Sequence, residues 1–220
     1  MAWHLEFAPV PLHSTMRKSE RYIDCVHRGE YMPESSRDLA KERCRVLLVP
    51  GIGNSGPEHW QSHWEQQHGS YLRVQQRDWE NPVCADWMET LEGAAQRAGP
   101  DVLIAAHSLG CLLVAHWLAR TSCRVKGALM VAVPDPNGSN FPAQALGFAP
   151  VPRGHFACPS TVVGSTDDPY GDPEFARQCA HGWGSRFVDI GPAGHINGAS
   201  GLGAWSEGHR LLEGLCLEIQ

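Results

Sequence analysis

The sequence predicts an α/β fold in which about six mostly parallel strands form one sheet covered by helices on both faces. Six short β-rich runs recur from Arg45 onward, and amphipathic stretches with helical spacing separate them. The runs are almost continuously apolar, as expected for strands that are buried on both faces. With 220 residues, of which 42% are hydrophobic, the chain can close one sizeable core. We therefore expect a single domain over residues 45–220.

The elements follow from these runs in chain order. Strands are expected over residues 45–50, 71–75, 102–106, 127–133, 160–165 and 186–191. Helices are expected near residues 58–67, 85–97, 109–120, 173–183 and 204–218, and Pro57 suits the first turn of the first of them. Residues 134–159 carry six prolines and three phenylalanines, so no regular helix is expected there. We interpret this insertion as a small cap or a surface loop.

The segment before the predicted domain shows no period of 2 or 3.6. Residues 1–44 mix proline, serine and charges of both signs, which predicts a flexible N-terminal extension. Eight cysteines are spread along the chain without a C-x-x-C pair, and several, such as Cys111, Cys179 and Cys216, lie in helical patterns. This spacing favours reduced, mostly buried thiols.

Charge and hydropathy restrict the partners. The formal net charge is −6, and no long basic cluster is present, which argues against nucleic acid and against an anionic membrane. No apolar run approaches 18 residues, and the first 20 residues lack the pattern of a signal peptide. We expect a cytoplasmic protein that acts on a small molecule, and the sequence leaves its oligomeric state open.

A nucleophile elbow is predicted where the third strand meets the following helix. The segment from Ala106 to Gly110 reads small-x-Ser-x-Gly, the pattern of a strained turn in which small neighbours let strand and helix pass closely. Ala106 stands where glycine is usual, and a methyl group is expected to fit. Ser108 is thus the candidate nucleophile, the alternative being a serine that only caps the helix. His107 should point away from it, because adjacent residues of a strand face opposite sides.

A serine hydroxyl needs a base, and the base needs a group that orients it. On hydrolase sheets these follow in the order Ser, Asp or Glu, His. "GSTDDPY" follows the fifth predicted strand, and "GPAGHING" follows the sixth. His195 is therefore the candidate base. Asp167 and Asp168 compete for the third position, and we favour Asp168.

The transition state of acyl transfer also needs donors for its oxyanion. The backbone N–H of Leu109 is one candidate, and Ile52 in the loop after the first strand is the other. Pro50 stands where many hydrolases carry histidine, which weakens the assignment of Ile52.

The motifs "VPGIGNSGPEHWQSHWE", "DWENPVCADW", "AHSLGCL", "STDDPY" and "GHINGASGLGAW" together resemble the small serine hydrolase family that includes retinoblastoma-binding protein nine, within the α/β-hydrolase superfamily. The resemblance covers about residues 45–218. It implies an α/β-hydrolase fold with strand order 2-1-3-4-5-6 and a minimal cap, and a Ser108, Asp168, His195 triad. The expected activity is hydrolysis of small carboxylic esters, with small amides as further candidate substrates, and no metal or organic cofactor is expected.

Three rival interpretations use other features. Gly51, Gly53 and Gly56 spell G-x-G-x-x-G, which would suit a dinucleotide-binding oxidoreductase. That site expects an acidic residue after the second strand, where residues 75–77 are Gln, Gln and Arg. His59 and His63 are spaced for a shared metal but lack the glutamate of H-E-x-x-H, and the neighbouring Trp60 and Trp64 indicate a helix face packed on the sheet. A binding protein on a catalytically weak hydrolase scaffold is the third interpretation.

Overall fold

The computed structural model describes residues 44–217, which build one six-stranded sheet with all neighbouring strands parallel. The strand order β2-β1-β3-β4-β5-β6 is the predicted one. The strands are β1 (Val46–Val49), β2 (Tyr71–Arg73), β3 (Val102–His107), β4 (Val125–Val131), β5 (Ser160–Gly164) and β6 (Arg186–Asp189). Because all of them are parallel, their carboxyl ends meet at one edge, where sites of such sheets lie.

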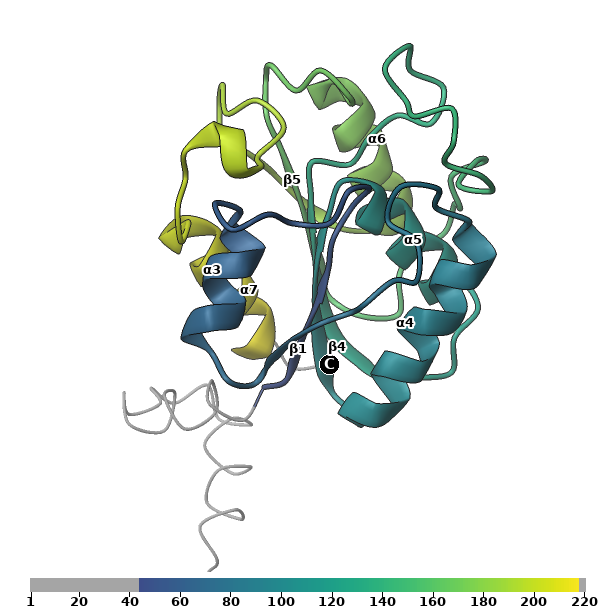
Figure 1. The fold of residues 1–220 in the computed structure, drawn as a ribbon, viewed down its shortest axis with the longest axis vertical. Helices are drawn as coiled ribbons and strands as arrows, with labels where there is room; N and C mark the ends of the chain where they lie inside the picture. The colour runs from purple at the N-terminus through teal and green to yellow at the C-terminus, as the bar shows by residue number, and fades with distance from the viewer. Residues whose placement is uncertain (1–43, 218–220) are drawn as a thin grey trace, which may run out of the picture. The chain divides into compact units, whose positions relative to one another are not determined.

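The helices cover both faces of the sheet (Figure 1). One layer holds α3 (Trp60–Gln67) and α7 (Ser206–Leu217), and the other holds α4 (Cys84–Ala98), α5 (Leu109–Leu118) and α6 (Pro173–Trp183). A short 3-10 helix, η1 (Gly198–Ser200), precedes α7. The helix bounds agree with the predicted ranges to within two residues, except that Pro57 lies in a turn before the N-cap His59 and not in the first turn of α3.

Side chains that alternate along the strands pack into two hydrophobic cores, one on each face of the sheet. Leu47 and Ile104 pack with the α4, α5 and α6 side, whereas Leu48 and Leu103 pack with Trp60 and the rest of the α3 and α7 side. All of these side chains are buried, as the apolar strand pattern predicts. A central strand with both faces covered is held rigidly, so groups placed at its end are held rigidly too.

The proline-rich insertion runs as irregular chain, as predicted. Among residues 134–159 it forms only one isolated bridge, between Leu146 and Val83, and it packs Phe148 edge-on against Trp87 of α4. Near its end Phe156 stacks on Trp183 of α6. The insertion therefore follows the helices of one face, and its first residues run beside the loop after β5 through a hydrogen bond from the Asp135 amide to the carbonyl of residue 170.

One cysteine prediction is wrong. Cys44 and Cys216 form a disulfide that joins a residue two positions before β1 to the last turn of α7 across 172 residues of sequence. The spacing of the cysteines gave no sign of this pair, because packing of α7 on the sheet brings its end to the start of β1. The other cysteines of the described part, residues 84, 111, 123, 158 and 179, are free thiols, and all but Cys123 are buried. The predicted extension, residues 1–44, lies outside the described residues except for Cys44.

No helix within residues 44–217 combines the length and apolar character needed to span a membrane.

Candidate active site

Ser108 occupies a sharp turn between β3 and α5. Its φ of 55° and ψ of −125° lie outside the regions that residues with a Cβ normally adopt, as expected of an elbow. The Ser108 amide donates to the Val131 carbonyl at 2.9 Å, and the Ser108 carbonyl accepts from the Cys111 amide at 2.8 Å. These bonds on both sides of the turn fix the strained backbone and direct the hydroxyl toward the carboxyl edge.

Small residues around the elbow are needed because backbones pass unusually close. A Cβ on Gly110 would lie 2.3 Å from the Val49 carbonyl oxygen, and one on Gly51 would lie 2.9 Å from the Ser108 Cβ. Glycine at both positions lets β1, its following loop and the start of α5 meet. Ala106, which replaces the usual glycine, is fully buried, so its methyl group is accommodated.

The structure brings together the three side chains selected from the sequence. His195 Nε2 lies 2.8 Å from Ser108 Oγ, and His195 Nδ1 lies 2.9 Å from each carboxylate oxygen of Asp168. The Asp168 side chain is 1% exposed and that of His195 10%. Since a carboxylate only accepts, Nδ1 carries the proton, which leaves Nε2 free to accept from the serine hydroxyl. The geometry forms one proton relay.

The two adjacent aspartates have different partners. Asp168 faces His195 and also accepts the Tyr170 amide at 2.9 Å. Asp167 Oδ1 instead accepts from the Ser165 hydroxyl at 2.8 Å and from the Gly194 amide at 2.7 Å. These hydrogen bonds, first of all that from Ser165, lower the pKa of Asp167 below its ordinary value. Asp167 thus anchors the loop that carries the histidine and does not contact its ring.

Further hydrogen bonds hold the His195 loop from the other elements. The His107 ring donates through Nε2 to the His195 carbonyl at 2.8 Å, and Trp60 Nε1 donates to the Ile196 carbonyl at 2.9 Å. Ser165 Oγ also accepts the Ala193 amide at 2.9 Å. As expected, His107 does not contact the serine as a base. The His107 ring fixes the backbone of His195, whose imidazole contacts the serine.

Burial keeps the neighbouring imidazoles neutral. The rings of His59 and His107 lie 4.6 Å apart, and both side chains are buried. Burial lowers the pKa of His59 to about 3 and that of His107 well below its ordinary value. A charged imidazolium beside the relay would oppose the positive charge that His195 must take up.

The predicted oxyanion donors belong to the two segments that meet at the elbow, the start of α5 and the loop after β1. Leu109 is the first residue of α5, and an ideal Cβ on Gly51 would be only 3.2 Å from its amide nitrogen. Within residues 44–217 the amides of Leu109 and Ile52 donate to no other group. The loop that carries Ile52 is fixed by the Gly53 amide, which donates to the Trp79 carbonyl at 2.9 Å. Both N–H groups are thus available to a ligand.

The rival patterns in this region have other uses. The "GIGNSG" loop packs its first glycine on the elbow, and Ser55 Oγ donates to Gln61 Oε1 at 2.6 Å. His59 Nδ1 accepts the Gln61 amide at 3.1 Å as the N-cap of α3. In the part of the chain that the structure describes, no three His, Cys, Asp or Glu side chains are grouped to hold a metal ion. Trp64, like Trp60, is buried against the sheet, as the helix pattern predicted.

Sequence reasoning missed the residues that position the histidine. The Ser165 and Asp167 contacts, the His107 bond and the Trp60 bond join segments that are 27 to 136 residues apart. Two features of the sequence mark these positions: His107 stands directly before Ser-Leu-Gly, and Asp167 and Asp168 are adjacent. Neither feature specifies which group the side chain contacts.

A serine on a strained turn, in contact with a histidine at the carboxyl edge of a parallel sheet with this strand order, is typical of the class of α/β hydrolases. The chain matches the serine hydrolase family over residues 46–214 and belongs to that family, as the resemblance of its motifs implied. The comparison with curated proteins gives no match.

Solved structures support the fold. The chain is similar to a protein described as a YdeN-like hydrolase from Pectobacterium atrosepticum, with 28% identity and a TM-score of 0.72 over 82% of this chain and 97% of that one. It is also similar to the ydeN gene product of B. subtilis, with 16% identity and a TM-score of 0.65 over 80% and 100% of the two chains. A thermophilic esterase from Thermogutta terrifontis shares 17% identity and a TM-score of 0.58 over 78% and 89%. The last two show the fold alone.

Proposed function

We propose that the chain hydrolyses small carboxylic esters through an acyl-enzyme formed on Ser108. The observation that carries the proposal is the relay from Ser108 Oγ through His195 to the buried carboxylate of Asp168, with contacts of 2.8 and 2.9 Å. Membership of the serine hydrolase family supports it independently.

In the proposed reaction, Ser108 Oγ attacks the ester carbonyl carbon while its proton passes to His195 Nε2. Asp168 stabilises the imidazolium that forms. The tetrahedral intermediate then collapses: the bond to the leaving oxygen breaks, and that oxygen takes the proton from Nε2 as the alcohol departs. Water attacks the acyl-enzyme with the same base, which releases the carboxylic acid and restores the serine.

The negative oxygen of each intermediate would lie against the N–H groups of Leu109 and Ile52. Donors that are fixed before reaction need no reorganisation, and losing one typically costs about 2.7 to 4 kcal/mol of barrier stabilisation. The start of α5 adds the positive end of its helix dipole at the same place.

The packing of the insertion supports a substrate class. The insertion at residues 134–159 packs Phe148 and Phe156 on helices of one face of the sheet, which supports a shallow site at the serine. We propose short acyl esters, with small amides as slower substrates, for an enzyme of the cytoplasm. A series of nitrophenyl esters tests the size preference, and a rate maximum beyond about twelve acyl carbons would contradict a shallow site.

Labelling with a fluorophosphonate probe tests the chemistry. The proposal requires one modified residue, Ser108, and loss of both labelling and ester hydrolysis in Ser108→Ala. A matched control is Ser122→Ala, which changes a serine outside the site and should leave both unchanged. Absence of labelling in the folded wild type would favour the binding protein on a hydrolase scaffold. Binding of a nicotinamide cofactor, followed by its fluorescence, would instead favour the oxidoreductase.

A further inference from the structure

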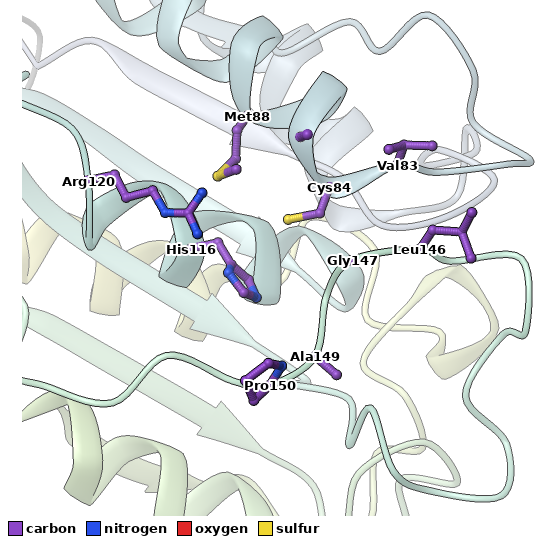
Figure 2. A pocket seen from close by; sticks show the side chains of 10 residues that line it. Val83, Cys84, Met88, His116, Arg120, Leu146, Gly147, Ala149 and Pro150 are labelled. Atoms are coloured by element: carbon purple, nitrogen blue, oxygen red, sulfur yellow. The ribbon is translucent and has the colours of Figure 1, made fainter.

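A cavity lies away from the relay, between α4, α5 and the insertion. Its volume is about 310 Å³, and none of the three relay residues lines it. Figure 2 shows the side chains of Met88, Cys84 and Arg120 directed toward a common space, with Pro150 of the insertion on the opposite side and Leu146 farther along the insertion. The complete lining is Val83, Cys84, Ala85, Met88, His116, Arg120, Leu146, Gly147, Ala149 and Pro150.

One end of this cavity is electropositive. Arg120 is an exposed residue at the rim, and its guanidinium has no ion pair or hydrogen bond within residues 44–217, although the chain as a whole carries a net charge of −6. Its positive charge partly offsets the burial that raises the pKa of Cys84, on the same cavity wall, to about 11. An arginine beside a cavity and without a carboxylate partner favours an anion there.

Two further polar groups line the cavity. His116 is 7% exposed and contacts the Phe148 carbonyl through Nε2 at 3.0 Å, while its Nδ1 has no partner among the described residues. The cavity also contains the start of α4, a 15-residue helix whose N-cap residue, Val83, makes no side-chain cap. The Cys84 amide donates to the Leu146 carbonyl at 2.9 Å, and Asp86 places a carboxylate in the first turn. The N–H of Ala85 has no partner inside the helix. A helix start of this kind favours negative charge.

The rest of the wall is apolar. Met88, Val83 and Pro150 contribute hydrocarbon or thioether surface, and Leu146 is 57% exposed although it is large and apolar. A ligand with an apolar part would cover Leu146, whereas a bare inorganic anion would leave it in water. The volume of about 310 Å³ corresponds to about ten water-sized groups, enough for a carboxylate on a short alkyl chain.

We infer that this cavity binds an organic monocarboxylate with a short alkyl chain, its carboxylate on the Arg120 guanidinium and its chain against Met88 and Leu146. The juxtaposition of one unpaired cation, the free amide of Ala85 and an apolar wall around a single hollow carries the inference. The site does not depend on the reaction proposed for Ser108.

The test follows the methyl signal of Met88 by NMR while the full chain is titrated with hexanoate. Met130, buried in β4, is an internal control that the ligand cannot reach, and Met88→Leu assigns the signal. We expect a saturable shift of Met88 alone. Hexanol, which lacks the charge, should bind about tenfold more weakly or worse, since a hydrogen bond to a charged group contributes about one power of ten or more to affinity. Inorganic phosphate should also bind about tenfold more weakly or worse, since it has no alkyl chain to bury.

Variants separate the cation from general charge effects. Arg120→Gln should weaken hexanoate binding about tenfold, because it replaces the guanidinium by a shorter, uncharged polar group. The control, Arg153→Gln, removes an exposed arginine of the insertion that does not line the cavity, and its titration should match the wild type.

Three results would overturn the inference: an unmoved Met88 signal, equal binding of hexanol or phosphate, or an unchanged midpoint in Arg120→Gln. Because the measurement needs no turnover, repeating it in Ser108→Ala separates this cavity from the relay. Retained binding in that variant supports a distinct site, and lost binding assigns the carboxylate to the serine and refutes the inference.

Discussion

Replacing Asp168 by Asn changes one atom of the proposed relay and leaves the size of the side chain unchanged. The Tyr170 amide donates to Asp168 Oδ1, so an Asn at this position keeps its oxygen there and turns its NH₂ group toward His195. His195 Nδ1 would then have to accept a hydrogen bond, which moves the ring proton to Nε2. A protonated Nε2 cannot take the proton of Ser108, so most molecules would hold the wrong tautomer.

The expected fall in kcat also includes the loss of the carboxylate's negative charge. A carboxylate about 4 Å from the imidazolium, at an effective dielectric constant of about 20, stabilises it by about 4 kcal/mol, or roughly a thousandfold in rate. The near-complete burial of Asp168, 1% exposed, means that solvent screens this interaction little. Together with the tautomer effect, we expect kcat to fall by roughly 10³ to 10⁴ with little change in KM.

The assay is hydrolysis of a short nitrophenyl ester, with the rate of fluorophosphonate labelling as a second measure of serine activation. Asp167→Asn is the matched control, because its amide oxygen can still accept from Ser165 and Gly194, and it should stay within about tenfold of the wild type. Circular dichroism and the unfolding temperature show that both variants fold. If Asp168→Asn retains more than about a tenth of the activity, or the two variants lose equal activity, the proposed relay is wrong.

Three further predictions concern the surroundings of the relay. Gly51→Ala should lower kcat by about tenfold or more by displacing the oxyanion loop, since the new Cβ would be 2.9 Å from that of the nucleophile, whereas Gly56→Ala, with no atom within 4 Å, should match the wild type. His107→Phe should lower kcat about tenfold by leaving a buried carbonyl without its donor, and His107→Gln should restore part of it; equal rates would refute the positioning role. His59, with a pKa of about 3 when folded and about 6.5 when unfolded, makes the protein less stable as the pH falls below about 6.5, because only the unfolded chain binds the proton. The free energy of unfolding, measured in urea, should fall between about pH 7 and 5.5 by about 1 kcal/mol less in His59→Asn than in the wild type. Asn keeps an N-cap acceptor, and an identical fall in both proteins would contradict the assignment.

The parts of the fold that depend on neighbours in the sequence were predictable. Apolar strands and amphipathic helices gave every element of residues 44–217 except the 3-10 helix η1, because their periodicity reflects local backbone geometry. The Ser108 turn was predictable for the same reason, since its strained backbone needs small residues at fixed positions beside it.

The chain order Ser, Asp, His also predicts that Ser108 and His195 lie at the same edge of the sheet. A parallel sheet collects the carboxyl ends of its strands, so loops that follow β3, β5 and β6 must meet. This is a property of topology, and topology follows from the sequence pattern.

Only the tertiary structure decided which groups touch. Asp167 and Asp168 are adjacent, and the direction of each side chain decides which of them contacts His195. The contacts of His107 and Trp60 with the His195 loop join segments that no local spacing connects. The Cys44–Cys216 disulfide and the cavity at Arg120 arise in the same way, from packing between elements distant in sequence. The sequence determines which chemistry the chain carries because short-range geometry fixes each element, whereas partners across the core depend on side-chain packing that only the folded chain defines.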